Sequence, residues 1–401
     1  MEPVKRIRRQ QCTNIQDVPK DLIQHIQSLL PLEEAARTCV LSKSWLHAWS
    51  TIPTLRFHPS SKLNETNYIK LINRTLRRYR RHNIPFVTFG LDFDVHDLKT
   101  VYRAHNWVRK VASMRCLKEL YLCISLDDRR IASYTFPDDL FSGENLNTIS
   151  VKSEPDVKSI LCISSDTVIK CVNLRVLKLC RVNIGAEVLD SVLSTCNLLE
   201  KIHLYDLKLR TFKVKNLRNL HSLKIKSITQ TDSLEVYQVP NLHKLTLGGS
   251  SFVFSNSTLP SFNTDLLGSV TTLILDGVSI MDDAVLNIIK SSFPFLLYLS
   301  LRMKRCNLKV LDITCPSLKR LIIELPKKKQ IEIQIYAPKL LYFLYSGEAM
   351  PSLFINPTTT PPPQIELELT FPHLKSIDDG HSIFLKLKEA LNIPSKFNNR
   401  L

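Results

Sequence analysis

The first 57 residues combine short apolar stretches at helical spacing with residues that end helices. Leu22 and Ile26 lie four residues apart, behind Pro19, which fits the first turn of a helix. Pro31 ends this helix and begins the next one, because proline lacks the N–H that a helix interior needs. The pattern therefore predicts a first helix that ends at a tight turn.

Two more helices are predicted after this turn. Residues 32–38 form a short second helix, and Ser42 is the predicted N-cap of the third. Trp45 and Trp49 lie four residues apart on one face of the third helix, which Pro53 ends. A unit of about 40 residues buries only a marginal core. Apolar surface is therefore left over, and we expect it to dock on a partner.

One apolar motif then recurs along most of the chain. It reads L-x-x-L-x-L, with Ile, Val, Phe or Tyr in place of some leucines, and successive copies are 21 to 29 residues apart. This spacing is typical of leucine-rich repeats, which stack into a solenoid. Copies begin at Leu117, Leu146, Leu174, Leu199, Leu220, Leu242, Val270, Leu296, Leu318 and Leu340, with Phe86 as the first of the series.

The repeat predicts an α/β fold in which a three-helix module precedes an irregular solenoid of parallel strands. Each L-x-L places two side chains on one face of a short strand, and successive strands stack into a sheet. Long repeats have room for a return helix, as at 186–196 and 282–291. The repeats of 21 or 22 residues leave less room, so we expect extended or irregular returns there. The asparagine that usually follows the strand is replaced by Val182, Leu207, Ile228 and Val278.

A set of N-terminal residues has a characteristic order and spacing. These are Val18-Pro19, Leu22-Ile23, Leu30-Pro31-Leu32, Ala35-Ala36-Arg37-Thr38, Val40-Leu41-Ser42-Lys43, Trp45, Trp49, Pro53, Leu55 and Phe57. Together they resemble a plant F-box, although Ser44 and Leu46 replace basic residues that usually flank the tryptophan. The repeats are similar to those that follow F-boxes in a large plant family, as the phrases at 315–318 and 337–340 show.

The resemblance implies a non-catalytic substrate receptor of an SCF-type cullin–RING ubiquitin ligase. The F-box would bind a Skp-family adaptor, and the repeats would capture a target protein for ubiquitination. Ile26 and Trp49 are interpreted as packing inside the three-helix unit. The residues that we expect to bind the adaptor are Pro19, Leu22, Ile23, Leu30, Pro31, Leu41, Ser42 and Trp45.

The target is expected on the concave face or the exposed loops of the repeats. Basic residues occupy exposed positions of the strands, which suggests an acidic target. The candidates for target binding are Arg175, Lys178, His203, Lys224, Lys244 and Arg320.

These patterns divide the chain into five parts. They are a basic flexible tail (1–14), the F-box (15–57), a helical basic linker (58–83), the leucine-rich repeats (84–357), and a Pro-rich break with a C-terminal cap (358–401) that includes a predicted helix at 383–391.

The chain carries a formal net charge of +17, which permits binding to nucleic acid or to acidic proteins. The basic run at 77–82 has no interleaved aromatic residues around it, so we interpret it as the solvated end of a helix. Two alternatives stay open. One is a basic repeat protein associated with nucleic acid, whose affinity falls steeply with salt. The other is a scaffold that takes no part in ubiquitin transfer.

The sequence contains no catalytic motif, and we expect neither an enzyme nor a cofactor nor a metal site. Asp92, Asp94, His96 and Asp97 gather after an early strand, but a solvated loop explains them more simply than a cation site. No apolar run of about 18 residues occurs, and the first residues lack the apolar core of a signal peptide. We therefore expect a location in the nucleus and/or the cytoplasm, with no membrane contact.

Overall fold

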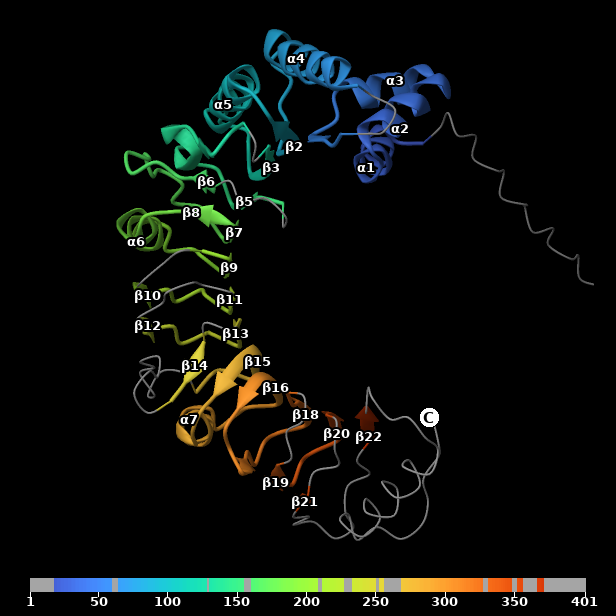
Figure 1. Ribbon diagram of the computed structural model, residues 1–401. Coiled ribbons are helices and arrows are strands. Elements are labelled where there is room, and N and C mark those ends of the chain that lie inside the picture. The colour runs from blue at the N-terminus through green and yellow to red at the C-terminus, as the bar shows by residue number, and fades with distance from the viewer. Residues whose placement is uncertain are drawn as a thin grey trace, which may run out of the picture.

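The architecture is one long parallel sheet bent into an arc, with a group of helices at its N-terminal end (Figure 1). The structure is a computed structural model, and it describes residues 18–59, 64–127, 130–154, 160–207, 211–226, 233–249, 252–255, 268–326, 331–347, 352–355 and 366–370. The predicted α/β solenoid behind N-terminal helices is confirmed. The predicted tail, the Pro-rich break and the terminal helix at 383–391 lie outside the described residues.

The helices at the N-terminal end form a small unit that we call the module. Ser42 caps its third helix as predicted, because the Ser42 side chain accepts a hydrogen bond from the Trp45 backbone N–H at 3.4 Å. Pro31 occupies the N-cap position of the second helix. The elements are α1 (Lys20–Leu29), α2 (Leu32–Arg37), the 3-10 turn η2 (Thr38–Val40) and α3 (Lys43–Ser50).

The strands of the main sheet pair in chain order and all in parallel, and β14 (Val253–Phe254) pairs beside β15. Among the described residues the sheet runs through β1 (Thr54–Phe57), β2 (Thr88–Val95), β3 (Glu119–Leu126), β5 (Thr148–Lys152), β7 (Val176–Cys180), β9 (Lys201–Tyr205), β11 (Ser222–Lys226), β13 (Lys244–Gly248), β15 (Thr272–Ile280), β16 (Tyr298–Cys306), β18 (Arg320–Glu324), β20 (Tyr342–Ser346) and β22 (Glu366–Thr370).

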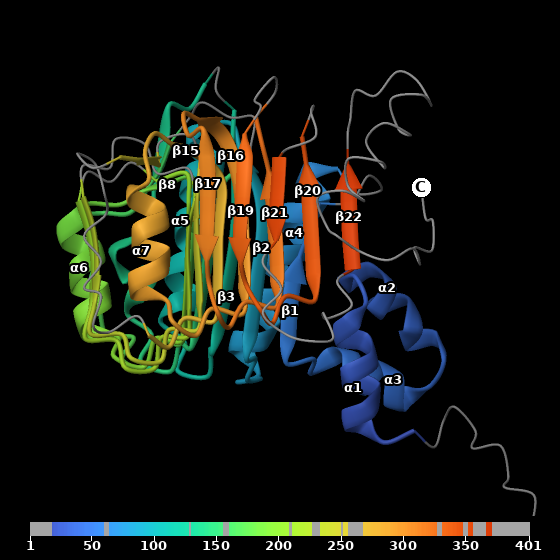
Figure 2. The ribbon, with the colours of Figure 1, turned by 90° about the horizontal axis from the view of Figure 1, so that it is seen from below.

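The returning segments cover the outer face of this sheet, as Figure 2 shows. The long repeats return through helices or a 3-10 turn: α4 (Glu65–Arg81), α5 (Leu98–Ala112), η3 (Asp138–Phe141), α6 (Ala186–Thr195) and α7 (Ala284–Ser292). Extended returns form three small parallel sheets: β4 (Ser133–Thr135), β6 (Ile160–Cys162) and β8 (Val182–Asn183); β10 (Thr211–Lys215) and β12 (Ser233–Tyr237); β17 (Val310–Thr314), β19 (Glu332–Tyr336) and β21 (Ser352–Ile355). The short repeats thus return through extended backbone, as their length predicted. None of the helices that the structure describes combines the length and the apolarity needed to cross a membrane.

The repeat sheet begins earlier than the predicted boundaries. β1 lies within the stretch 15–57 that we predicted as F-box, yet it pairs in parallel with β2 and is the first strand of the sheet. Leu55 and Phe57 on β1 are each 1% exposed and belong to the core of the array. α4, which we predicted as a linker, likewise buries Tyr68 and Ile72 against this core. Linker and first repeat are therefore one unit.

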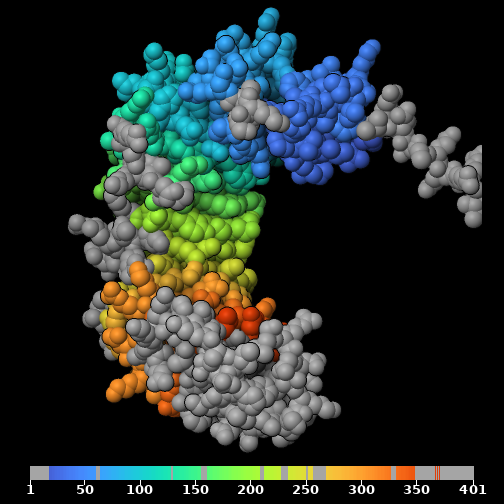
Figure 3. All heavy atoms as spheres, turned by 45° about the vertical axis from the view of Figure 1, so that its right-hand side comes forward, coloured from blue at the N-terminus to red at the C-terminus, as the bar shows by residue number. Residues whose placement is uncertain are grey.

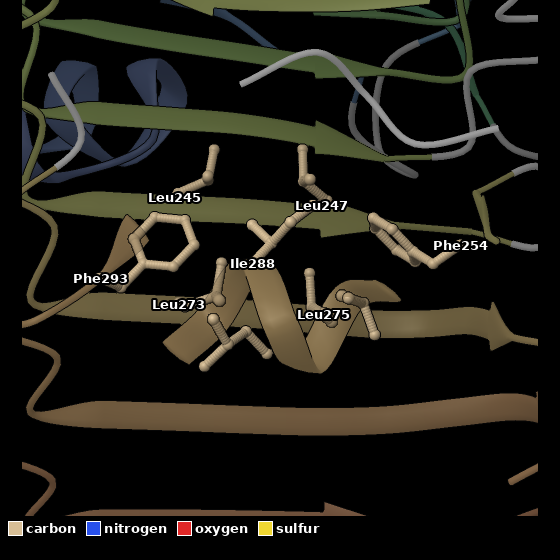
Figure 4. Close-up of a pocket in the computed structure, with 9 residues that line it drawn as sticks. Leu245, Leu247, Phe254, Leu273, Leu275, Ile288 and Phe293 are labelled. Carbon is tan, nitrogen blue, oxygen red and sulfur yellow. The ribbon is translucent and has the colours of Figure 1, made fainter. Parts of the chain in front are cut away.

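The interior of the array consists of stacked apolar side chains in register. Leu179, Leu204, Ile225 and Leu247 occupy equivalent positions on neighbouring strands, and each is at most 1% exposed. Figure 4 shows the same arrangement where the leucines of β13 and β15 meet Ile288 of α7. The space left between these side chains is about 10 Å³, which is too small for a ligand.

A recurring corner follows the strands and explains how the repeats dispense with asparagine. Arg181, Asp206, Gly249 and Gly277 occupy equivalent positions just after β7, β9, β13 and the regular part of β15, and each has a positive φ. After three of these corners comes a buried apolar residue. These residues are Val182, Leu207 and Val278, whereas Ile228 lies outside the described residues. Apolar packing holds the corners, as predicted.

Candidate functional site

The module exposes more apolar side chains than it buries. Its own core consists of Ile23, Trp45 and Ala48, with Val18 packed against them. Its exposed large apolar residues define what we call the apolar surface of the module. They are Leu22, Ile26, Leu29, Leu30, Val40, Leu41 and Leu46. Val40 is 88% exposed and Leu29 is 72% exposed. Contiguous exposed apolar surface on a soluble protein indicates an interaction site.

The structure places the predicted adaptor-binding residues in two different environments. Pro19, Leu22, Leu30, Pro31 and Leu41 are exposed, so they are available to a partner. Ser42 is half-buried and caps α3, so its hydroxyl shapes the module.

Ile23 and Trp45 lie in the interior, and this corrects their assignment to direct contact. Ile23 is fully buried and Trp45 is 4% exposed, because both fill the space between α1 and α3. The buried side chain of Gln27 also donates to the Trp45 backbone carbonyl at 3.1 Å, which ties α1 to α3. These two residues therefore shape the surface from within.

Ile26 is a correction in the opposite direction. We predicted that it packs inside the module, but it is 37% exposed, because on α1 it lies beside Leu22 rather than beside Ile23. Leu29, Val40 and Leu46 also belong to the exposed surface, and sequence reasoning did not assign them to the adaptor. One signal for them existed: the stretch contains more apolar residues than a unit of this size can bury.

Trp49 fixes the module to the repeat array. As predicted it packs inward, but its partner lies outside the module: the Arg78 guanidinium of α4 lies over the Trp49 ring, 4.7 Å from its centroid. On the next residue, the Tyr79 hydroxyl donates to the Ile52 backbone carbonyl at 2.9 Å. Ala35 of α2 joins the array core. The basic run at 77–82 is therefore not solvated throughout, because Arg78 is half-buried in this junction.

The concave face of the array carries the second candidate site, and Figure 3 shows that the arc is open on its inner side. Five residues on β7, β9, β11 and β13 form what we call the basic cluster: Lys178, Lys201, His203, Lys224 and Lys244. Lys178, His203 and Lys224 are direct neighbours across three strands. Lys201 and Lys244 lie in a second line, with Ser222 between them.

The positive charge of this cluster is not neutralised by the described residues. No described carboxylate lies within 4.0 Å of the four lysines, whereas nearby Lys226 is paired with Asp276. His203 responds to this environment: burial, and then Lys178 and Lys224, lower its pKa to about 4. The structure thus brings four of the predicted candidates together. It adds Lys201, which stands directly before the first inward residue of its strand.

Arg175 and Arg320 do not belong to this cluster. Arg175 is paired with Glu200, so its charge is already neutralised. Arg320 lies on β18, three strands beyond β13, where its guanidinium lies 4.6 Å from the centroid of the Tyr342 ring. Spacing along the chain did not reveal these partners, because each comes from a neighbouring repeat.

The four polar residues after β2 separate into different roles. Asp97 caps α5, and its side chain accepts from the Thr100 backbone N–H at 2.7 Å. This hydrogen bond lowers the pKa of Asp97. Asp92 faces His58 at 3.6 Å, and His96 faces Glu65 at 3.6 Å. The described part of the chain contains no group of three metal-ligating side chains.

The fold and the two surfaces define a leucine-rich-repeat solenoid with an N-terminal docking module. A family model described as "At1g61320/AtMIF1, LRR domain" matches residues 80–259. The F-box/LRR-repeat protein At3g26922 of Arabidopsis thaliana is 29% identical over 50% of this chain and 63% of its own length. The putative F-box protein At1g49610 of Arabidopsis thaliana is 27% identical over 60% of this chain and 56% of its own length.

The F-box protein At1g80960 of Arabidopsis thaliana is 27% identical over 55% of this chain and 46% of its own length. The chain thus spans about half the length of the curated relatives that it matches. It belongs to the plant F-box/leucine-rich-repeat family.

Proposed function

We propose that this protein is the substrate-recognition subunit of an SCF-type cullin–RING E3 ubiquitin ligase. The observation that carries the proposal is the apolar surface of the module, which its own fold leaves uncovered. A Skp-family adaptor would bury this surface and would connect the chain to the cullin. The repeats would hold the target, and the chain itself would carry no catalysis. We place this activity in the nucleus and/or the cytoplasm, where cullin–RING ligases act.

The rigid junction around Trp49 suits this function. A receptor must hold its target at a defined position relative to the adaptor, and the Trp49–Arg78 contact joins the module to the first repeat. The Tyr79–Ile52 hydrogen bond reinforces the same connection. The module and the array would then move as one body when the adaptor binds.

The test is co-purification of the full chain with a plant Skp-family adaptor and cullin. We expect the intact chain to bind both proteins. Leu29→Glu/Val40→Glu should lose at least tenfold in affinity for the adaptor, because two charges then face a surface that must be desiccated on binding. Leu30→Ala/Pro31→Ala should weaken binding in the same direction.

The matched control places the same charges on another exposed apolar pair. Leu98 and Tyr102 of α5 are 80% and 69% exposed, and they lie outside the module. Leu98→Glu/Tyr102→Glu should leave adaptor binding unchanged. If the intact folded chain fails to bind the adaptor, the proposal is wrong. If it binds the adaptor but never the cullin, the protein is a scaffold without ubiquitin transfer.

A further inference from the structure

The concave face divides into two zones of different chemistry. The basic cluster occupies β7 to β13. On β15 to β20 the outward positions of the strands are instead apolar or aromatic, and we call these residues the apolar cluster: Ile274, Tyr298, Ile322, Tyr342 and Leu344. Two more exposed apolar residues, Leu297 and Leu341, directly precede Tyr298 and Tyr342.

The two zones are adjacent along one continuous sheet. Lys224 on β11 pairs in register with Thr246 on β13, and Thr246 pairs with Ile274 on β15. Thr246 is 2% exposed, and its hydroxyl has no partner among the described residues. The line then continues through Ser300 to Ile322 and Leu344. A single ligand that lies across the strands therefore meets both zones.

The basic cluster favours an anionic ligand. Lysines on strands about 4.8 Å apart repel one another, and an anion between them relieves this repulsion. His203 carries the same signature, since its neighbouring lysines hold the ring neutral. An anion at this place would raise the pKa of His203 and draw a proton onto the ring.

The apolar zone favours a protein segment over a nucleic acid. Its carboxylates are already engaged: Glu324 is paired with Arg302 at 2.7 Å, and Glu368 accepts from the Tyr342 hydroxyl at 2.6 Å. These carboxylates would repel a phosphate backbone that continues beyond the basic cluster. An apolar side chain of a peptide would find Tyr298 and Leu344 instead.

The geometry sets the spacing of such a segment. From β11 to β18 there are four strand intervals in the sheet. At about 4.8 Å per interval they span roughly 19 Å, which an extended peptide covers with about six residues. The concave face therefore matches acidic residues and apolar residues that are about six positions apart.

We propose that the concave face binds an extended segment of a target protein in which a run of acidic residues stands about six positions from an aromatic or aliphatic pair. The acidic run contacts the basic cluster, and the apolar pair contacts Tyr298, Ile322 and Leu344. This inference rests on the proposed function, because it names the class of target that the receptor captures.

The test uses the full chain bound to its adaptor and two fluorescein-labelled peptides. Each peptide carries Asp-Glu-Asp-Glu and Phe-Leu with their centres six residues apart, in opposite orders, with a Gly-Ser spacer. We expect one of them to bind with a micromolar dissociation constant by fluorescence anisotropy. A peptide without the Phe-Leu pair, and one with Gln and Asn in place of the acids, should each bind at least tenfold more weakly.

Two variants of the receptor check each zone. Lys178→Glu/Lys224→Glu should weaken the peptide at least tenfold, and Tyr298→Ser should weaken it about fivefold. The matched control is Lys290→Glu on the exposed side of α7, which should leave binding unchanged. Adaptor binding by every variant, with circular dichroism, separates a lost site from a lost fold.

Three outcomes overturn the inference. One is that neither peptide binds at 1 mM while the adaptor still does, which leaves the proposed function intact. Another is that the Phe-Leu pair makes no difference, which reduces the site to a simple anion site. A third is that a 15-nucleotide single-stranded DNA binds the basic cluster more tightly than either peptide, with a steep salt dependence.

Discussion

The module and the repeat array solve the problem of apolar burial in opposite ways. The array forms one continuous core from Ala35 to Tyr345, and its strands cover one another in register. The module keeps only Ile23, Trp45 and Ala48 in a core of its own. The comparison shows that similar apolar content has two destinations. In the array the next repeat completes the core, whereas in the module a partner must complete it.

The largest effect is expected in the middle of the array. Leu204 is fully buried between the leucines and isoleucines of β7 and β11. Leu204→Ala should lower the free energy of unfolding by about 2–5 kcal/mol, because it removes buried methyl groups and leaves a cavity. Urea denaturation followed by circular dichroism measures this. A loss below 1 kcal/mol would show that the array is not tightly packed at its centre.

Acid should weaken the array through His203. Its pKa is about 4 in the folded chain, against 6.5 in an unfolded chain. The unfolded chain therefore binds the proton first, and stability is lost as the pH falls from about 6.5 to 4, by on the order of 2 kcal/mol.

The matched variants isolate this contribution. In His203→Asn the loss over this pH window should be absent. Lys178→Gln/Lys224→Gln should only reduce it, because burial is the larger cause of the lowered pKa. Urea midpoints between pH 4 and pH 7.5 provide the measurement. An identical pH profile for the His203→Asn variant and the unmodified chain would contradict the prediction.

The junction should lose about 1 kcal/mol when its cation–π contact is removed. Arg78→Ala leaves the Trp49 ring without the guanidinium that covers it. Hydrogen exchange should speed up in α3 and β1, while β9 and β11 keep their rates. The matched control is Arg77→Ala, one residue earlier on the exposed side of α4. Equal effects of the two variants would mean that the contact does not fix the module.

The smallest effect on stability is expected on the apolar surface of the module. Val40 is 88% exposed, so Val40→Ser should change the free energy of unfolding by less than about 0.5 kcal/mol. Its affinity for the adaptor should fall by a larger factor than this change in stability allows. If Val40→Ser instead destabilises the free chain as Leu204→Ala does, the contrast between module and array fails.

The local pattern was sufficient to predict the elements. Pro31 and Ser42 mark the ends of the module helices, since both act on the backbone of their own turn. The L-x-L positions became the buried rows of the sheet, because alternation along a strand decides which side chains share a face. The length of each repeat also separated helical returns from extended ones.

The same pattern misplaced residues whose surroundings come from elsewhere in the chain. Ile23 and Ile26 look alike in the sequence, but α3 covers only one of them. Arg78 looked like one more solvated arginine until α3 brought Trp49 to it. Arg175 looked like a free cation until the next strand brought Glu200 to it.

The sequence by itself determined the family of the fold, the order of its elements and the presence of surplus apolar surface in the module. These properties follow from periodicity, proline and capping, which act over a few residues. Only the tertiary structure decided which charges stay unpaired, where the module ends and the sheet begins, and how basic and apolar zones adjoin on the concave face. Those properties depend on the register between strands more than 20 residues apart, where partners meet that no local pattern joins.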